Sequence, residues 1–135
     1  MVSKIFVNLP VKDLDKSIAF FKAVGFSFNP QFTDKTAACM VMSDVIYAML
    51  LTHDKIKQFT EKQIADAHRT TEVLTALAVE SKAKVNELVD KAIKAGGKDA
   101  HPPKDYGFMF TRSFEDPDGH IWEVFWMDPA RVQTG

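Results

Sequence analysis

Residues 113–127 constrain the fold of this chain more than any other stretch, because they join a defined turn to a strand. The four residues Asp116-Pro-Asp-Gly119 have turn chemistry. Pro117 fixes φ at the first corner, the Asp116 side chain can accept backbone amides ahead of it, and Gly119 tolerates a positive φ. Residues 120–126 are rich in β-branched and aromatic side chains, which predicts a strand with at least one buried face.

Alternation along this strand makes Glu123 conspicuous. Side chains of a strand point alternately to its two faces, so Glu123 lies between Ile121 and Phe125, and both tryptophans lie on the other face. A buried carboxylate without a partner is energetically costly. Glu123 must therefore face a wet cavity or have a partner.

The rest of the chain repeats one order of elements twice: strand, helix, glycine stop, hairpin. In the first half we expect a strand over residues 4–11 and a helix from the N-cap Asp13 to about residue 24. Gly25 ends this helix, and a short strand at 26–28 precedes a hairpin of 37–42 with 45–52. In the second half we expect a strand over 73–80 and a helix capped by Ser81 and closed by Gly96. The hairpin of 106–114 with 120–127 completes that half.

Residues 53–72 separate the two halves and are polar and charged. The run Thr60-Glu-Lys-Gln63 has the spacing of a capping box, which predicts a short helix to about His68. Two interpretations stay open for this segment: a plain connection between the halves, or a lid over a ligand site.

Composition excludes several classes of function. With 135 residues, 46% of them hydrophobic, the chain can form one globular domain with a sizeable core. The formal net charge is −1 and no long run of one sign occurs, which argues against nucleic-acid and membrane-surface partners. A single cysteine, Cys39, excludes an internal disulfide. Neither a signal peptide nor an apolar stretch of membrane-spanning length is evident, so we expect a cytoplasmic protein.

The closing turn with Glu123 resembles the last hairpin of the glyoxalase/bleomycin-resistance/dioxygenase superfamily, also called the vicinal oxygen chelate fold. Residues 6–21, FVNLPVKDLDKSIAFF, resemble the opening strand and helix of that family, and Gly25-Phe26 matches the glycine that follows. The resemblance covers nearly the whole chain. It implies an α+β fold of two βαβββ modules side by side, forming a cupped mixed sheet with the helices outside. The modules would be about residues 1–52 and 73–127 of a single domain.

In metal-using members of this family, four side chains from the first and last strand of each module meet in a cleft. Carried over by register, these positions are Phe6, Leu50, Leu74 and Glu123. Only Glu123 can bind a metal, and no residue next to the other three offers a good ligand. A catalytic metal site needs about three protein ligands. We therefore expect no metal and no cofactor, and a cleft lined with hydrocarbon.

Further polar candidates lie near these positions. Asn8 should share the face of Phe6, and the neighbouring strand should add Ala48 and Thr52 to the Leu50 face. Residues 106–114 present either a set with Arg112 or a set with Ser113, and the sequence does not decide which lines the cleft. Arg112 is the natural counter-charge for Glu123 if it points inward. The histidines lack the spacing of a helix-borne metal pair, and we expect ordinary roles for His53, His68, His101 and His120.

Three functions stay open. The first is a binding protein that holds a small organic molecule without transforming it, with ligand contacts from Phe6, Asn8, Leu50, Leu74, Arg112 and Glu123. The second is a lyase, isomerase or extradiol dioxygenase that uses Glu123 as a general base. The third is a purely structural dimer. A homodimer is expected in each case, because open strand edges are usually paired or covered and because similar superfamily members usually pair.

Overall fold

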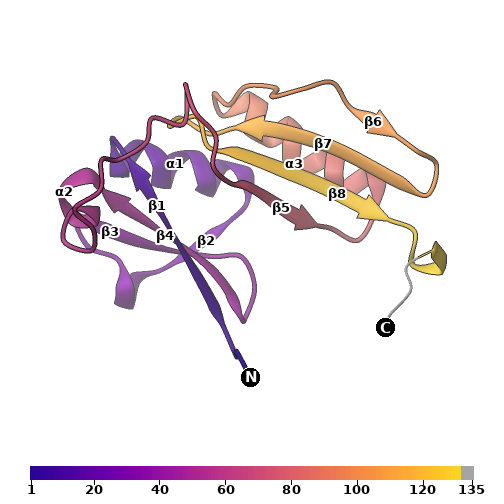
Figure 1. The fold of residues 1–135 in the computed structure, drawn as a ribbon. Coiled ribbons are helices and arrows are strands. Elements are labelled where there is room, and N and C mark those ends of the chain that lie inside the picture. Colours follow the sequence, from indigo (N-terminus) through magenta and orange to yellow (C-terminus); the bar gives the residue numbers. More distant parts are fainter. Residues whose placement is uncertain (132–135) are drawn as a thin grey trace. The chain divides into compact units, whose positions relative to one another are not determined.

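A computed structural model describes residues 1–131 of the chain. The chain forms two compact units, Met1–Asp66 and Ala67–Gly135, and each has its own sheet and its own core (Figure 1). Neither α1 nor any other helix within residues 1–131 combines the length and apolar composition that crossing a membrane requires.

The first unit contains a four-stranded sheet in the order β1-β4-β3-β2 (Figure 1). Strand β1 runs parallel to β4, and the other pairs are antiparallel. The elements in chain order are β1 (Ile5–Val11), α1 (Leu14–Val24), β2 (Ser27–Asn29), η1 (Pro30–Phe32), β3 (Ala37–Val41), β4 (Ile46–Thr52) and α2 (His53–Ile56).

The second unit repeats this topology, with a sheet in the order β5-β8-β7-β6 and β5 parallel to β8. Its elements are β5 (Leu74–Ala78), α3 (Lys82–Lys94), β6 (Lys104–Asp105), β7 (Met109–Glu115), β8 (Ile121–Met127) and η2 (Pro129–Arg131). Strand, helix and three further strands thus occur twice, and the predicted α+β fold of two βαβββ modules is confirmed.

Local capping signals explain where the two long helices begin and end. The Asp13 side chain accepts the Lys16 amide at 3.1 Å, and the Ser81 hydroxyl accepts the Lys84 amide at 3.1 Å. Gly25 ends α1 with φ 121°, a conformation that residues with a side chain rarely adopt. These residues are the helix limits that the sequence predicts.

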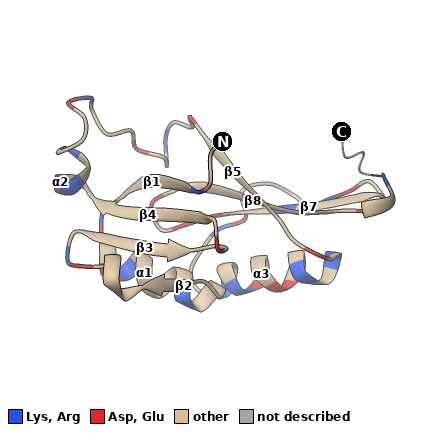
Figure 2. Cartoon of the chain, turned by 90° about the horizontal axis from the view of Figure 1, so that it is seen from below, with Lys and Arg blue, Asp and Glu red and all other residues tan. Residues whose placement is uncertain are grey.

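In each unit the helix covers one face of its own sheet. Helix α1 buries Phe20, Phe21 and Val24, and α3 buries Val85, Val89 and Ala92. On the face that the helix covers, each sheet buries residues that pack against it. They are Ala38, Met40, Ala48 and Leu50 in the first unit and Phe114, Trp122 and Val124 in the second. Burying a large apolar side chain contributes about 1.5–3 kcal/mol. Charged residues gather along α3 and in the loops, while the strands are mostly uncharged (Figure 2).

The Asp-Pro-Asp-Gly turn forms as predicted and is tied down by one buried carboxylate. Asp116 Oδ1 accepts the amides of Asp118 at 2.9 Å and His120 at 3.0 Å, and its Oδ2 accepts Trp122 Nε1 at 3.0 Å. Burial raises the pKa of the Asp116 carboxyl, whereas the charge of His120 and these hydrogen bonds oppose that shift. Gly119 has φ 85°, as the turn requires.

The connecting segment differs from the prediction. The helix expected from Thr60 to about His68 is absent, and the only helical turn between residues 53 and 72 is α2. Thr52 caps α2 by accepting the Lys55 amide at 3.2 Å. The Thr60 hydroxyl instead accepts the Lys62 amide, two residues ahead, at 3.1 Å. A hydrogen bond of that short span closes a local turn and competes with helix formation, so the capping-box spacing was misleading.

Candidate functional site

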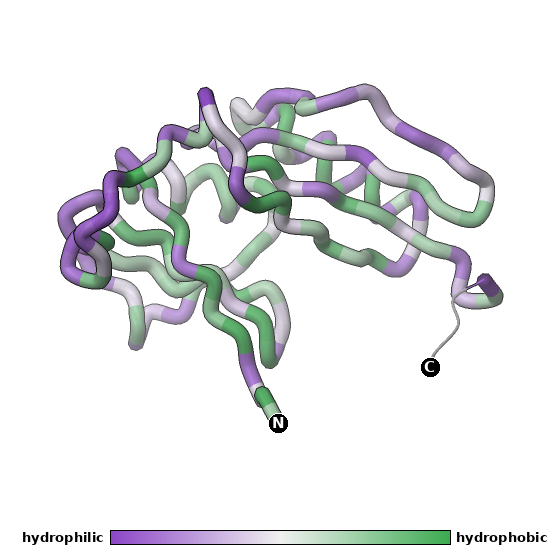
Figure 3. Tube along the Cα trace, viewed as in Figure 1, coloured by the Kyte–Doolittle hydropathy of each residue, from purple (hydrophilic) through white to green (hydrophobic). Residues whose placement is uncertain are grey.

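The open face of the second sheet, opposite the face that α3 covers, carries the carboxylate of Glu123 at its centre and that of Glu115 nearer the end of β7. By register Glu123 lies between Ala76 of β5 and Ser113 of β7. Residues in register share a face of a sheet, and alternate residues follow on the same face. On β5, β7 and β8 the open face therefore consists of Leu74, Ala76, Ala78, Met109, Thr111, Ser113, Glu115, Ile121, Glu123, Phe125 and Met127. Leu74 is 53% exposed, and hydrophobic residues occur along both β5 and β8 (Figure 3).

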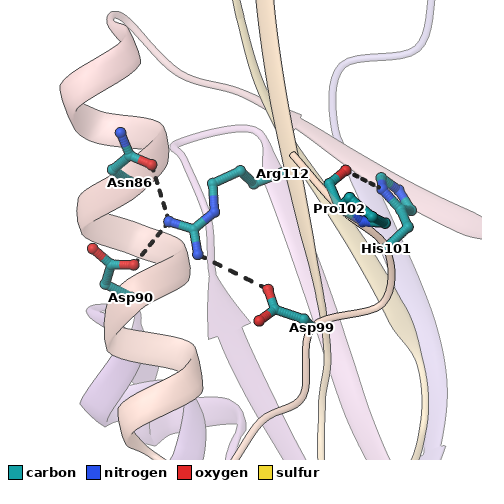
Figure 4. A network of polar contacts seen from close by, with 6 residues as sticks. All are labelled: Asn86, Asp90, Asp99, His101, Pro102 and Arg112. Atoms are coloured by element: carbon teal, nitrogen blue, oxygen red, sulfur yellow. Dashed lines mark hydrogen bonds and ion pairs between the residues drawn. The ribbon is translucent and has the colours of Figure 1, made fainter. Parts of the chain in front are cut away.

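His101 is the partner of Glu123. It belongs to the loop between α3 and β6, and its Nε2 lies 2.9 Å from Oε1 and 3.1 Å from Oε2 of Glu123. Its Nδ1 lies 3.2 Å from the carbonyl oxygen of Pro102 (Figure 4). Both ring nitrogens therefore face oxygen acceptors, and only the doubly protonated imidazolium can donate to both. The Glu123 side chain is 19% exposed and that of His101 is 34% exposed.

The surroundings of His101 favour its charged form. The hydrogen bond to Glu123 raises the pKa of His101 most, and the hydrogen bond to the Pro102 carbonyl adds to this effect. Partial burial and the charge of Lys104 act in the opposite direction. The sequence prediction of an ordinary histidine missed this role. A carboxylate that requires a partner was visible in the sequence, but no sequence signal points to a histidine 22 residues away.

Arg112 is not the counter-charge of Glu123: the sequence left open which face of residues 106–114 it takes, and in the structure it lies on the face away from Glu123. It lies in register with the buried Val124, so its side chain is on the α3 face. Its Nη1 donates to Asn86 Oδ1 at 2.9 Å and to Asp90 Oδ1 at 2.8 Å (Figure 4). Its Nη2 lies 3.9 Å from Asp99 Oδ1. The guanidinium thus holds α3 and the following loop against β7.

The other set of β7 residues faces Glu123. Ser113 is directly across from Glu123 and fully buried, and its Oγ has no hydrogen-bond partner. A buried hydroxyl without a partner is uncommon, because its desolvation is not compensated. The open face therefore holds a polar atom without a hydrogen-bond partner in the residue across from Glu123.

The candidates in the first unit divide between the two faces of its sheet. Phe6 and Asn8 lie on the face away from α1, and the Phe6 ring is 48% exposed and stacks on Tyr47, with ring centroids 4.6 Å apart. Leu50 is fully buried on the α1 face, in register with Leu9. The expectation that Leu50 shares a face with Phe6 was therefore wrong.

The error in placing Leu50 is a register shift of one residue. Phe6 pairs with Tyr47 and Asn8 pairs with Met49, so Met49 takes the place assigned to Leu50. Because side chains alternate, a shift of one residue moves a whole strand to the opposite face. The residues expected beside Leu50, Ala48 and Thr52, follow it to the α1 face. Leu74, by contrast, shares the open face with Glu123, as expected.

The donor set does not fit the metal of metal-using relatives. With the corrected register, the four carried-over positions are Phe6, Met49, Leu74 and Glu123, of which one is a carboxylate and none is an imidazole. His101 adds a single nitrogen, which contacts Glu123 itself. Within residues 1–131 no cluster of three or more His, Cys, Asp and Glu side chains is placed to hold a metal ion.

Comparison with known proteins agrees with the fold. Residues 5–124 match the glyoxalase/bleomycin resistance protein/dioxygenase superfamily. A hypothetical protein from S. aureus has a similar structure, with a TM-score of 0.78 and 28% identity, over 93% of this chain and 95% of that chain. No curated protein matches the sequence.

Two further solved structures share the fold at lower identity. A glyoxalase/bleomycin resistance protein/dioxygenase family enzyme from Burkholderia phytofirmans PsJN has a TM-score of 0.73 and 19% identity, over 90% of this chain and 96% of that chain. The fosfomycin resistance protein FosX from Mesorhizobium loti has a TM-score of 0.68 and 15% identity, over 96% of this chain and 97% of that chain. The duplicated βαβββ topology and the match over residues 5–124 lead to one conclusion: the chain belongs to the glyoxalase/bleomycin resistance protein/dioxygenase superfamily.

Proposed function

We propose that this protein binds a small organic molecule on the open face of the second sheet and does not transform it. One observation carries the proposal: the carboxylate of Glu123 lies beside the apolar side chains of Leu74, Ala76 and Phe125 on one open face, and Leu74 there is 53% exposed. Binding sites for small molecules combine such an apolar lining with a few polar groups that fix the orientation of the ligand. Ligand contact by Phe6 and Asn8, which are exposed on the sheet of the first unit, stays a separate prediction.

The hydrogen bonds of the site favour binding over catalysis. A general base needs a free oxygen or nitrogen that reaches the proton of the substrate. Both oxygens of Glu123 face His101 Nε2, and His101 Nδ1 faces the Pro102 carbonyl. In this structure the imidazole of His101 thus lies where the proton of a substrate would have to reach Glu123, which favours holding a molecule over removing its proton.

An enzyme of the lyase, isomerase or extradiol dioxygenase kind is the alternative. The observation in its favour is the carboxylate–imidazole pair itself, since such pairs perform acid–base chemistry in many enzymes. In that function Glu123 would act as the base after His101 has moved. Turnover of the methylglyoxal–glutathione hemithioacetal or of catechols, measured together with metal content, would establish the enzyme and contradict the binding function.

A ligand screen by thermal melting tests the binding function. The panel contains small aromatic amines, amidines and neutral amides, together with fosfomycin as an anionic comparison suggested by the similarity to FosX. A ligand at about 100 times its Kd stabilises the folded state by about 2.7 kcal/mol. We expect this stabilisation to be lost in Leu74→Asp, which places a charge on the open face, and kept in Glu87→Gln, an exposed carboxylate of α3 on the other side of the sheet. Equal stabilisation of both variants, or no ligand in a broad panel, would contradict the proposal.

The cellular location belongs to the same proposal. Cys39, the single cysteine, is a buried free thiol, and burial raises its pKa, so it is a poor nucleophile and oxidises slowly. A free thiol is compatible with the reducing cytoplasm, where we place the protein.

A further inference from the structure

We infer that the His101 imidazole occupies a site built for the protonated nitrogen of a ligand, formed by Glu123 and Ser113. A small molecule with an apolar body and a cationic head, such as an amine or amidine, displaces the imidazole and takes its place. This inference rests on the proposed binding function and names the chemical class of its ligand.

The first support is that, among residues 1–131, no cation of a strand forms an ion pair with Glu123. Its neighbours in register are Ala76 and Ser113, and the arginine of β7, Arg112, is on the opposite face. Lys104 of β6 is in register with Thr111 and so lies on the open face. Its charge lowers the pKa of His101. The cation that pairs with Glu123, His101, therefore comes from a loop.

The second support is the unused capacity of the site. His101 Nε2 carries one hydrogen, and that hydrogen is directed at Glu123. Ser113 Oγ, fully buried and directly across the strand pair from Glu123, has no partner. An ammonium has three N–H donors and an amidinium has four. Either head can bond Glu123 and Ser113 together, which one imidazole nitrogen cannot do.

The third support is that His101 can leave without disturbing the sheet. It lies in the loop between α3 and β6, outside the strand pairing, and its side chain is 34% exposed. The loop is joined to β7 by the bridge between Lys98 and Glu115, three residues before His101. Pro102 and Pro103, which follow, have no backbone N–H to bind to a strand. The His101 side chain can therefore swing away while the Lys98 bridge stays closed.

The apolar neighbours of Glu123 define the body of the ligand. Ala76 is exposed beside Glu123, and Leu74 and Phe125 lie on the same face one alternation further. A flat hydrocarbon or aromatic group suits this surface. An anionic head would meet the charge of Glu123 directly, so carboxylates and phosphonates are excluded by repulsion.

The experiment compares benzamidine with its neutral analogue benzamide by calorimetry on the full chain. The proteins are the wild type, His101→Ala, and His101→Ala combined with Glu123→Gln. If His101 fills the site roughly nine-tenths of the time, its removal tightens the apparent affinity for benzamidine about tenfold. We expect that gain in His101→Ala, its loss in the double variant, and no comparable gain for benzamide. 4-Methylimidazole, which mimics the missing side chain, should also bind His101→Ala and not the wild type.

Two variants extend the test. Ser113→Ala added to His101→Ala should weaken benzamidine about three- to tenfold if the hydroxyl accepts an N–H. His101→Gln replaces His101→Ala if the alanine variant does not fold, because glutamine removes the charge and keeps a donor for Glu123. The control is His53→Ala, an exposed histidine in α2, which should leave benzamidine affinity unchanged.

Equal benzamidine affinity in the wild type and His101→Ala would overturn the inference, as would equal affinity of His101→Ala for benzamidine and benzamide. The proposed function has a separate outcome. If neutral molecules bind and Leu74→Asp abolishes that binding while the cation preference is absent, the binding function stands and the displacement of His101 is wrong. If no small molecule binds any variant, both fail.

Discussion

Arg112 and Glu123 lie on neighbouring strands, yet their side chains are on opposite faces of the second sheet. Arg112 is in register with Val124, one residue beyond Glu123, and that single step directs its guanidinium to α3. The carboxylate is left to a loop histidine, His101. The arginine of β7 is thus part of the helix packing, and the partner of Glu123 on the open face comes from a loop.

Stability should depend on pH through His101. Its pKa is raised above 6.5 in the folded protein, so the stabilisation from its charged form is complete below about pH 6.5 and is lost as pH rises through the folded pKa. We expect wild type to exceed His101→Gln in unfolding free energy most at about pH 5.5 and least at about pH 8.5. Urea unfolding at several pH values measures the difference.

The groups that act on His101 in this prediction are Glu123 and Lys104, together with the Pro102 carbonyl. His53→Gln in α2 serves as the control and should show no such trend relative to the wild type. A difference between wild type and His101→Gln that is constant or grows with pH would mean that the ion pair does not stabilise the fold.

Removing the guanidinium of Arg112 should destabilise the second unit. The Arg112 side chain is 13% exposed and donates to both Asn86 and Asp90, and hydrogen bonds to charged groups contribute about 1.5–3 kcal/mol. We expect a loss of about 2–3 kcal/mol for Arg112→Ala, and little recovery in Arg112→Lys because one ammonium cannot reproduce the planar fork. Chemical denaturation measures both variants. The control is Lys94→Ala, at an exposed position of α3, which should leave the free energy of unfolding nearly unchanged. If Arg112→Ala were as stable as Lys94→Ala, Arg112 would not hold α3 against β7.

Two glycines with positive φ separate backbone strain from close packing. A Cβ on Gly119 would lie 2.7 Å from His68 N and 2.9 Å from the carbonyl carbon of Ala67, whereas nothing lies within 4 Å of a Cβ on Gly96. Alanine in the left-handed region costs about 1–2 kcal/mol, which both substitutions should show. Gly119→Ala should lower the free energy of unfolding clearly more than Gly96→Ala, because the backbone of residues 67–68 must move to admit the Cβ. Melting temperatures of the two variants test this. Equal decreases in melting temperature would show that residues 67–68 can shift at little energetic cost.

We propose that the protein is a homodimer that pairs through exposed strand edges. Strand β1 is at the edge of the first sheet, and Ile5 there is 51% exposed beside Ile46 at 40%. Edges with apolar side chains are usually paired or covered. Sedimentation equilibrium at about tens of micromolar, where specific dimers persist, should give twice the chain mass, and Ile5→Asp should shift it towards the monomer. A monomer mass for the wild type would refute the dimer.

Local features of the fold were predictable, because their causes lie within a few residues. Asp13 and Ser81 begin the helices, Gly25 ends α1, and Asp116 closes its turn, all through contacts no more than six residues apart. Alternation within β8 correctly set Glu123 apart from the tryptophans.

Features that join distant strands were not predictable. The register of β4 against β1 depends on pairing across some forty residues, and a shift of one residue moved Leu50 to the wrong face. The face of β7 that meets Glu123 was undecided for the same reason. The pairing of His101 with Glu123 depends on where a loop returns to the sheet, and neither spacing nor propensity encodes that position.

The pairing of the first strand of each sheet with its last has a consequence during synthesis. Strand β1 cannot complete its ladder until β4 has left the ribosome, and β5 waits in the same way for β8. The sheet of the first unit is closed by Thr52, so it can be finished before any strand of the second unit has emerged. In the second unit the last strand is also the one that carries Glu123, so the open face of that sheet forms only after its other strands have been synthesised.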